Sequence, residues 1–298
     1  MFFRNLIPFR IEAGTHLNAT DVAEKLARQA FQPCGSQDMK SRGWIPPRDG
    51  DSLVHSVGGN WLLALGSEQK LLPAAVINQT VQARAAAFEK TLGYRPGRMQ
   101  RAVMKDQIVT DLLPRAFSRY HTTWVWIAPK EGWLCVDASN ARKADEVLEV
   151  LAKSLDDLPL KRLKTETSPA SAIADWLAAD EAPAGFSIDR DCELKAGGEE
   201  KATVRYLRHP LDGEEIRAHI AGGKMPTRLA LTFDDRISFV LTDKLEIKRL
   251  AFLDILKEEA ERQAENADEI FDAELTLMGG ELLRLLPALV EALGGEVA

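Results

Sequence analysis

The sequence predicts an α+β fold, in which mixed sheets pack with helices. Residues 228–250 alternate apolar and polar side chains with the period of two that is typical of β-strands. Residues 73–113 instead repeat apolar side chains every three or four positions, which is the spacing of one helical face. Segments of both kinds are interspersed along the chain, so neither an all-α nor an all-β protein is expected.

The charge and composition exclude several classes of protein. The 298 residues include 38 Lys and Arg against 45 Asp and Glu, and the formal net charge of −7 excludes a uniformly basic, histone-like binder. No stretch approaches the roughly 18 consecutive apolar residues of a membrane span. The first residues lack the features of a secretion signal, so we expect a cytoplasmic protein. Cys34, Cys135 and Cys192 are expected to be reduced thiols, because their spacing fits neither a disulfide framework nor a zinc site.

The N-terminal part predicts strands and one helix. Residues 2–11 predict a strand, and Thr20 is the predicted N-cap of the helix that follows. Residues 32–51 are rich in Gly, Pro and polar side chains and predict a loop. The segments 53–57 and 61–65 predict a hairpin, because the Gly58-Gly59-Asn60 sequence between them favours a tight reversal.

Helical periodicity continues from residue 73 to residue 113, with an interruption at residues 93–97. This pattern predicts two helices joined as a hairpin. In the second helix Arg98, Arg101 and Lys105 are spaced by three and four residues, so they share one face.

The middle of the chain predicts two paired strands, at 122–127 and 133–136, and we expect both faces of these strands to be covered. Ser139 is the predicted N-cap of a helix with Ala144, Val147 and Leu151 on its inner face. The polar, proline-bounded segment 159–169 is the predicted linker, which divides the chain near residue 165.

The remainder predicts helices around 171–179 and 214–220, a strand near 186–194, a meander of three strands at 228–250 and a C-terminal helix. The meander turns are expected at Asp234-Asp235 and Thr242-Asp243. One meander face is polar and mostly basic. The predicted core-facing set of the meander is Leu229, Leu231, Phe233, Ile237, Phe239, Leu241, Leu245 and Ile247.

No catalytic or metal motif is complete. Gly222-Gly223-Lys224 lacks the earlier glycine and the Ser or Thr of a phosphate-binding loop, so a helix ending in glycine is the better interpretation. The histidines show no metal-ligand spacing. The acidic pairs Asp234-Asp235 and Glu199-Glu200 leave a magnesium-dependent nuclease as an alternative, because oxygen ligands suit a hard cation. We expect no metal site, no cofactor and no enzyme activity.

The charges are distributed unevenly. Residues 84–120 carry a net charge of +5, whereas residues 250–298 carry −9. Clustered Lys and Arg neutralise phosphates and release counterions, which gives nucleic-acid affinity without sequence preference. The alternative is that these are simply solvated faces. The overall acidity therefore does not by itself exclude DNA as a partner.

Two stretches carry a resemblance to a known family. Residues 31–39, Phe-Gln-Pro-Cys-Gly-Ser-Gln-Asp-Met, precede Gly-Trp-Ile-Pro-Pro at 43–47, and residues 112–119 read Leu-Leu-Pro-Arg-Ala-Phe-Ser-Arg. Both resemble signature stretches of the bacterial recombination-associated protein RdgC family. Further similarities, from residues 2–6 to residues 293–296, follow the family's order along the whole chain.

The resemblance implies a protein that binds duplex DNA without marked sequence preference and is not an enzyme. Horseshoe-shaped subunits pair at both ends as a homodimer, close a ring around DNA and limit the access of the RecA recombinase. The implied division is a central α/β domain (1–72 and 118–165), a helical tip domain (73–117) and an α+β base domain (166–298). We expect a cytoplasmic protein that is associated with the nucleoid. Besides the DNA-binding ring and the nuclease, a third hypothesis is a scaffold that binds RecA directly.

Individual residues receive expected roles from the charge pattern and the resemblance together. Phe117 matches a position where the family places an aromatic side chain at the contact that closes the ring, while an ordinary core Phe is the alternative. Arg208 and His209 align with a basic and polar pair that the family presents to DNA. The expected DNA-binding residues are Arg95, Arg98, Arg101, Lys105, Arg115, Arg119, Arg208, His209, Lys224, Arg228, Lys248 and Arg249.

Overall fold

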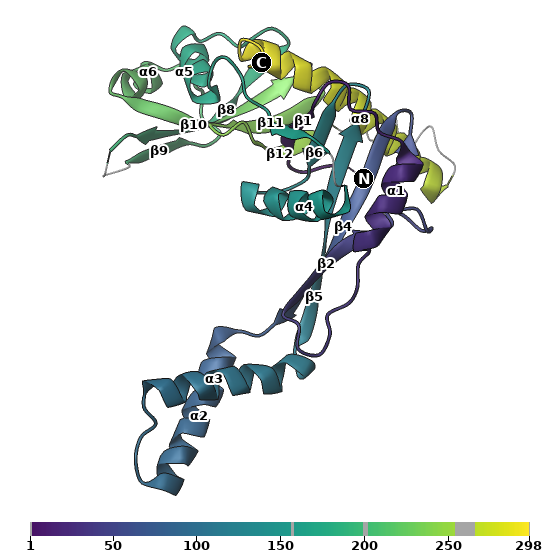
Figure 1. Cartoon of the computed structure of the whole chain (residues 1–298). Helices are drawn as coiled ribbons and strands as arrows, with labels where there is room; N and C mark the ends of the chain where they lie inside the picture. Colours follow the sequence, from purple (N-terminus) through teal and green to yellow (C-terminus); the bar gives the residue numbers. More distant parts are fainter. Residues whose placement is uncertain (1, 156–157, 199–201, 254–265, 298) are drawn as a thin grey trace.

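The computed structural model describes residues 2–155, 158–198, 202–253 and 266–297. It confirms the mixed α+β architecture, with two antiparallel sheets and helices packed against them (Figure 1). Every strand of the first sheet precedes residue 163, and every strand of the second follows residue 185. We call them sheet B and sheet A, respectively.

Sheet B has the strand order β2-β4-β5-β6-β1-β7, and β3 pairs with β4. Helices α1 (Ala19–Leu26) and α4 (Ala141–Ser154) cover one of its faces and bury an apolar core there. Its strands are β1 (Ile7–Ile11), β2 (Lys40–Ile45), β3 (His55–Val57), β4 (Asn60–Leu71), β5 (Phe117–Ala128), β6 (Trp133–Val136) and β7 (Leu160–Arg162).

Sheet A has the strand order β12-β11-β10-β8-β9. The predicted core-facing residues of the meander are all buried, so this prediction is confirmed. The strands are β8 (Phe186–Ala196), β9 (Thr203–Tyr206), β10 (Lys224–Phe233), β11 (Ile237–Thr242) and β12 (Ile247–Phe252). Helices α5 (Pro169–Ala179) and α6 (Glu214–Ala221) pack against β10 of this sheet.

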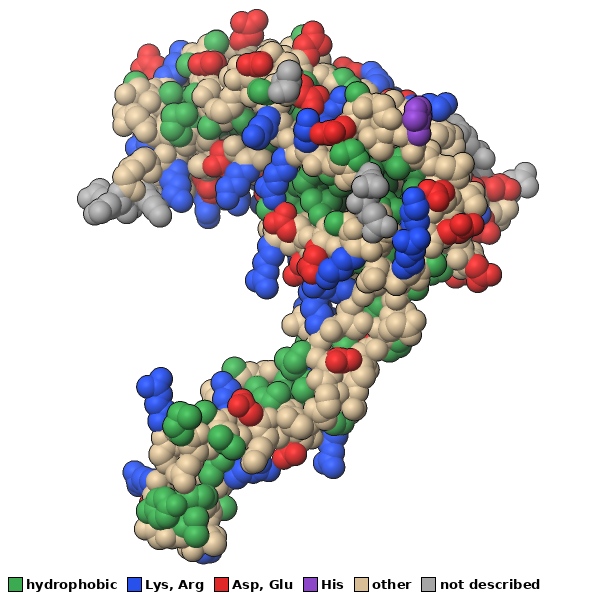
Figure 2. Space-filling model, in the orientation of Figure 1, with side chains coloured by type: hydrophobic (Ala, Val, Ile, Leu, Met, Phe, Trp, Pro, Cys, Tyr) green, Lys and Arg blue, Asp and Glu red, His purple; other side chains and the backbone are tan. Residues whose placement is uncertain are grey.

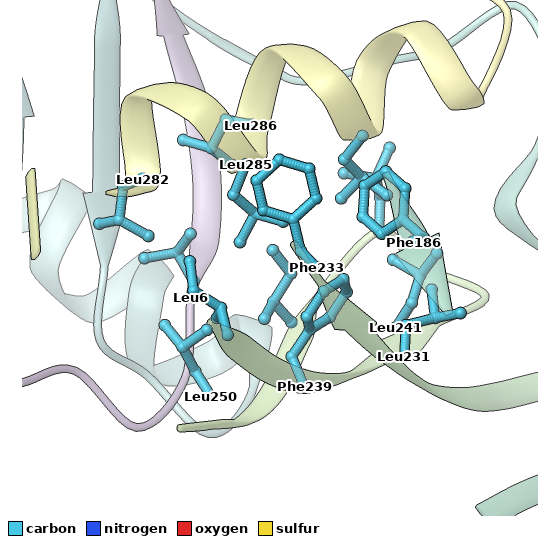
Figure 3. Packing of buried hydrophobic residues seen from close by; sticks show 14 of the residues in the cluster. Leu6, Phe186, Leu231, Phe233, Phe239, Leu241, Leu250, Leu282, Leu285 and Leu286 are labelled. Carbon is cyan, nitrogen blue, oxygen red and sulfur yellow. The ribbon is translucent and has the colours of Figure 1, made fainter. Parts of the chain in front are cut away.

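The long helix α8 (Ala267–Ala292) joins the two sheets through one core. Leu282, Leu285 and Leu286 of α8 are fully buried in this core, where Phe239 of sheet A also lies (Figure 3). Trp126 of β5 belongs to the same core, whereas Ile127 faces the core under α1 and α4. Both faces of β5 are therefore covered here, as the sequence predicts.

The halves of β4 and β5 farthest from the cores form an arm, in which residues 67–71 pair with residues 117–121 and β2 also pairs with β4 as far as Gln69. The arm carries the helices α2 (Ala74–Leu92) and α3 (Arg98–Leu112), which confirm the predicted helical hairpin. Figure 1 shows this hairpin standing away from both sheets. Between it and sheet A the surface is deeply hollowed in Figure 2.

Several local predictions are wrong. The N-caps are Asn18 and Asn140 in place of Thr20 and Ser139, because the asparagine carboxamides accept the free amide hydrogens of the first helical turns. The predicted strand at 2–11 is regular only from Ile7. The predicted loop at 32–51 contains β2, which pairs with β4.

Other parts of the sequence interpretation hold. The hairpin turns at Gly58 and Gly59, both of which have positive φ, 57° and 84°. The segment predicted as a linker differs from that prediction in its first part, because it carries β7, which pairs with β1 at the edge of sheet B. All three cysteines are free thiols, and burial raises the pKa of Cys192 to about 12. No helix in the described ranges has the length and apolar character needed to cross a membrane.

Candidate nucleic-acid interface

Lys and Arg side chains gather along the side of the molecule that borders the hollow (Figure 2). They lie over the exposed face of sheet A and beside α4, opposite the projecting hairpin. Two surface pockets organise most of this basic region, one on sheet A and one at the root of the arm.

The sheet A pocket has a volume of about 360 Å³. Arg205, Glu193 and Arg228 stand side by side on β9, β8 and β10 and form its cross-strand row. Burial raises the pKa of Glu193, but hydrogen bonds from Thr227 and Arg205 prevail and hold that pKa below its ordinary value. The carboxylate of Glu193 is therefore an anion that lies between the two exposed guanidinium groups of Arg205 and Arg228.

Lys248 and Arg249 both line the same pocket although they are consecutive residues of β12. Adjacent side chains in a regular strand point to opposite faces. Here a register shift between β11 and β12, together with a positive φ of 49° at Arg249, brings both onto one side. Arg249 also contacts Asp191, with Nη1 3.4 Å from Oδ2.

The arm pocket lies between α4 and the strands β2, β4 and β5 of sheet B and has a volume of about 430 Å³. The predicted residue Arg119 lines it from β5. The remaining charged or imidazole side chains of the pocket are Lys40, Arg42, His121, Arg142, Lys143 and Glu146.

The two pockets are neighbours. Lys248 of sheet A donates a hydrogen bond of 2.7 Å from Nζ to the carbonyl oxygen of Ser139. Ser139 lines the sheet A pocket, and the next residue, Asn140, lines the arm pocket. The basic surface is therefore continuous from β9 to the root of the arm, and we call it the basic strip.

Five of the predicted residues remain apart from this strip, on the tip. Arg98, Arg101 and Lys105 are exposed on one face of α3, as their spacing predicts. Arg95 is in the turn before α3, where its Nε lies 3.1 Å from Glu89 Oε1. Arg115 is exposed at the end of the hairpin.

The other predicted residues occupy different environments. Arg208 has a positive φ of 52°, and its backbone N–H donates to Asp191, the carboxylate that also meets Arg249. His209 is exposed beside it. Lys224 is separate, because its Nζ lies 2.9 Å from His219 Nδ1 and so faces the side of sheet A that α6 covers.

Sequence reasoning missed Lys40, Arg42, Arg142, Lys143 and Arg205. The first two lie in β2, which the sequence presents as a polar loop, and Arg205 lies in the four-residue strand β9. Arg142 and Lys143 begin α4, and only the packing of that helix against sheet B shows that they face the arm pocket. The polar residues Arg119, His121 and Thr123 occupy every second position of the segment 117–123. That alternation could have predicted a strand with one polar face at the arm.

The tip presents apolar surface instead of charge. Phe117 is 83% exposed at the start of β5, opposite Leu71, so it is not a core residue. A groove of about 720 Å³ between α2 and α3 has mainly apolar walls, including Phe88, Leu92 and Val103. Exposed apolar side chains and apolar grooves are features typical of protein interaction surfaces.

Of the two acidic pairs, the structure describes Asp234-Asp235. Asp234 and Asp235 both have positive φ in the turn between β10 and β11, and Asp234 pairs with Arg284. This is turn geometry with charge neutralisation. No group of three or more His, Cys, Asp or Glu side chains suited to a metal occurs among the described residues. Glu199 and Glu200 lie outside them.

Comparison with known proteins gives one consistent answer for the class of protein, a family associated with recombination. The family described as "Putative exonuclease, RdgC" matches residues 1–296. A recombination-associated protein RdgC of Dechloromonas aromatica (strain RCB) is 57% identical over 300 residues, covering 100% of this chain and 99% of the relative. Those of Janthinobacterium sp. (strain Marseille) and Cupriavidus pinatubonensis are 52% and 53% identical, covering 100% and 99% of this chain and 99% of each relative.

The match extends over essentially the full length of the chain and of these relatives. The chain belongs to the RdgC family.

Proposed function

We propose that this protein binds duplex DNA without sequence preference, acts without catalysis and requires no cofactor. The observation that carries the proposal is the continuous basic strip, which borders the hollow between sheet A and the tip. Exposed guanidinium groups, such as those of Arg228, Arg249 and Arg142, suit contacts with phosphates. Phosphate contacts position a protein on DNA and carry no sequence information.

The second part of the proposal is that the horseshoe-shaped subunit forms a homodimeric ring around the duplex. An exposed aromatic side chain, Phe117, and an apolar groove on the same tip supply the surfaces for a self-complementary contact. In a twofold dimer the same patch of each subunit meets its copy, so the tip of one subunit would contact the tip of the other. Closure would retain DNA topologically while the individual phosphate contacts remain weak.

Occupancy of DNA by this ring would limit the access of the RecA recombinase and thereby RecA-dependent recombination. The names of the relatives associate those proteins with recombination, which supports this setting. In this proposal the protein is in the cytoplasm and associates with the nucleoid.

Fluorescence anisotropy with labelled duplexes of two unrelated sequences tests the binding proposal. If about 6 to 10 phosphates are contacted, affinity falls by roughly 10³ to 10⁵ between 50 and 200 mM salt. We expect this fall for both sequences, with similar affinity for each. Absence of salt-sensitive binding to either duplex would overturn the proposal.

A nuclease remains the second candidate, because the family description contains the word exonuclease. Incubating linear and circular plasmid with the protein and Mg²⁺ separates the two functions, since a binding protein leaves both DNAs intact. A scaffold that acts on RecA directly predicts that the two proteins associate without DNA, which size-exclusion chromatography of the mixture would detect.

A further inference from the structure

The floor of the arm pocket is made of two cross-strand rows. One row is Lys40, Gln69 and Arg119, and the next is Arg42, Ser67 and His121, each taken in order from β2, β4 and β5. Neighbouring strands are about 4.8 Å apart, so each row spans about 10 Å. The floor is therefore polar, and its cationic side chains stand at both edges.

The first turns of α4 form the wall of the pocket. Arg142, Lys143 and Glu146 contribute its charged groups. Glu146 forms ion pairs with the β2 edge of the pocket. Its Oε2 lies 2.6 Å from Lys40 Nζ and 3.7 Å from Arg42 Nη1. Despite burial, the hydrogen bond from Lys40 keeps the pKa of Glu146 below its ordinary value. Glu149 lies 3.5 Å from Arg42 Nη2 through its Oε2, so the two carboxylates together neutralise the β2 side of the pocket.

The opposite side of the pocket has no such compensation. Within the described part of the chain, the side chains of Arg119 and Lys143 make neither a hydrogen bond nor an ion pair. Arg142 is 91% exposed, and its Nε approaches Glu146 only to 3.9 Å. Arg142 is therefore partly compensated by Glu146, whereas Arg119 and Lys143 are two cationic groups that border the polar hollow without a paired carboxylate among the described residues.

His121 stands on the floor between these cations. Desolvation and the positive charges of Lys143 and Arg119 lower the pKa of His121, although Asp137 acts in the opposite direction. The empty pocket therefore disfavours the protonated form of the imidazole. The charged groups that face it from the packed elements are Lys40 and Arg42 of β2, Arg119 of β5, Asp137 before α4, and Arg142, Lys143 and Glu146 of α4.

We propose that the arm pocket is a seat for one phosphodiester group, which Arg119 and Lys143 hold and to which His121 donates a hydrogen bond after taking up a proton. This inference rests on the proposed function, because the phosphodiester is assigned to the backbone of duplex DNA. A phosphate placed among these residues replaces the missing anion. It also stabilises the imidazolium, whose two N–H groups are both donors.

Proton uptake follows from the change in charge. The free pocket holds the pKa of His121 below its ordinary value, and a bound phosphate raises that pKa. Between the two pKa values the complex binds more protons than the free partners, so affinity rises as the pH falls. One linked proton permits a rise of at most about tenfold per pH unit.

Nuclear magnetic resonance of the histidine side chains tests the seat directly. The His121 pKa is measured in the full chain alone, with inorganic phosphate, and with a short duplex. We expect both ligands to raise the pKa of His121, and we expect neither to perturb the side-chain resonances of His16, which lies at another surface pocket. No change at His121 with either ligand overturns the inference.

The same titration separates the failure of this inference from failure of the proposed function. If the duplex does not bind but inorganic phosphate raises the His121 pKa, DNA binding is wrong and the pocket serves a small phosphate compound. If the duplex binds at neutral pH without affecting His121, the function stands and the seat is wrong.

Substitution gives an independent readout of the same proposal. DNA affinity of the parent protein is expected to increase between pH 7.5 and 5.5, and His121→Gln is expected to lose most of that increase. The control His16→Gln is expected to keep it. An identical pH profile in His121→Gln and the parent protein would contradict the proposal.

Discussion

The backbone N–H of Cys34 donates a hydrogen bond of 2.7 Å to the carboxylate of Glu68. Glu68 lies on β4 at the root of the arm and is 3% exposed, and Ser118 of β5 donates to the same carboxylate. One anion thus ties the segment before β2 to both strands of the arm.

The Glu68 contact predicts a local dependence on pH. Hydrogen bonds from Ser118 and Cys34 lower the pKa of Glu68. A lowered pKa stabilises the fold above the ordinary carboxyl range, and that contribution is lost as the pH falls through the folded value. We expect protection of the Cys34 amide against hydrogen exchange, relative to its intrinsic rate, to decrease below about pH 4.

Glu68→Gln is expected to lower Cys34 amide protection already at neutral pH, because a neutral acceptor makes a weaker hydrogen bond than a carboxylate. The variant also loses the acid-dependent step. Glu131→Gln, at an exposed position away from the arm, serves as the control and is expected to leave Cys34 unaffected. Equal protection in Glu68→Gln and the parent protein would show that the contact does not hold the segment.

Two neighbouring glycines of α8 predict opposite effects on stability. A Cβ at Gly279 would lie 2.1 Å from Asn60 Oδ1, the atom that accepts the Trp126 indole hydrogen bond of 3.0 Å. Gly279→Ala is therefore expected to reduce the free energy of unfolding by about 1–3 kcal/mol. A Cβ at Gly280 meets no atom within 4 Å, and Gly280→Ala is expected to stabilise the helix by about 0.5–1 kcal/mol.

Chemical denaturation of the two alanine variants measures both effects in one host protein. We expect the changes in the free energy of unfolding of the two variants to have opposite signs. Destabilisation of similar size in both variants would mean that contact with Asn60 is not the reason for the small residue at 279.

Phe117→Ala is expected to weaken the proposed dimer without weakening the subunit fold, because an 83% exposed ring contributes little to the core. If Phe117 is a central contact, its loss costs at least about 2 kcal/mol in association, or roughly thirtyfold in the dissociation constant. Sedimentation at several concentrations, together with a thermal melt, separates association from folding.

The control for Phe117→Ala is Val297→Ala, which shortens an exposed apolar side chain near the C-terminus. It is expected to leave association unchanged. A Phe117→Ala protein with the parent's mass distribution and DNA affinity would argue against a tip contact.

The sequence predicts best where one face of an element is buried. The meander of sheet A alternates from Leu229 to Ile247, since its inner residues meet α8 and α5, and its strands follow from that pattern. By contrast, β2 reads Lys-Ser-Arg-Gly-Trp-Ile, and its polar half faces the arm pocket, so no apolar period reveals it. Residues 67–70 in the arm half of β4 are all polar, so no apolar period marks them either, and the predicted strand ends at residue 65 although β4 extends to Leu71.

The site was less predictable than the fold, for a physical reason. Arg228 and Lys248 appear on one predicted sheet face, but their proximity to α4 depends on the Lys248 contact with Ser139, 109 residues away. The arm pocket combines three strands and a helix that are separated in sequence. Charge spacing within α3 was visible, whereas the continuity of the basic strip required the tertiary structure.

The salt dependence of duplex affinity, measured for the parent protein and for a double variant of the basic strip, tests the central claim most directly. Each lost phosphate contact reduces the slope of log K against log salt by about 0.9. Arg228→Gln with Arg249→Gln is therefore predicted to reduce the slope by nearly 2, and the control Lys130→Gln, outside the strip, to leave it unchanged. Equal slopes for the double variant and the parent protein would contradict the claim that the strip binds DNA.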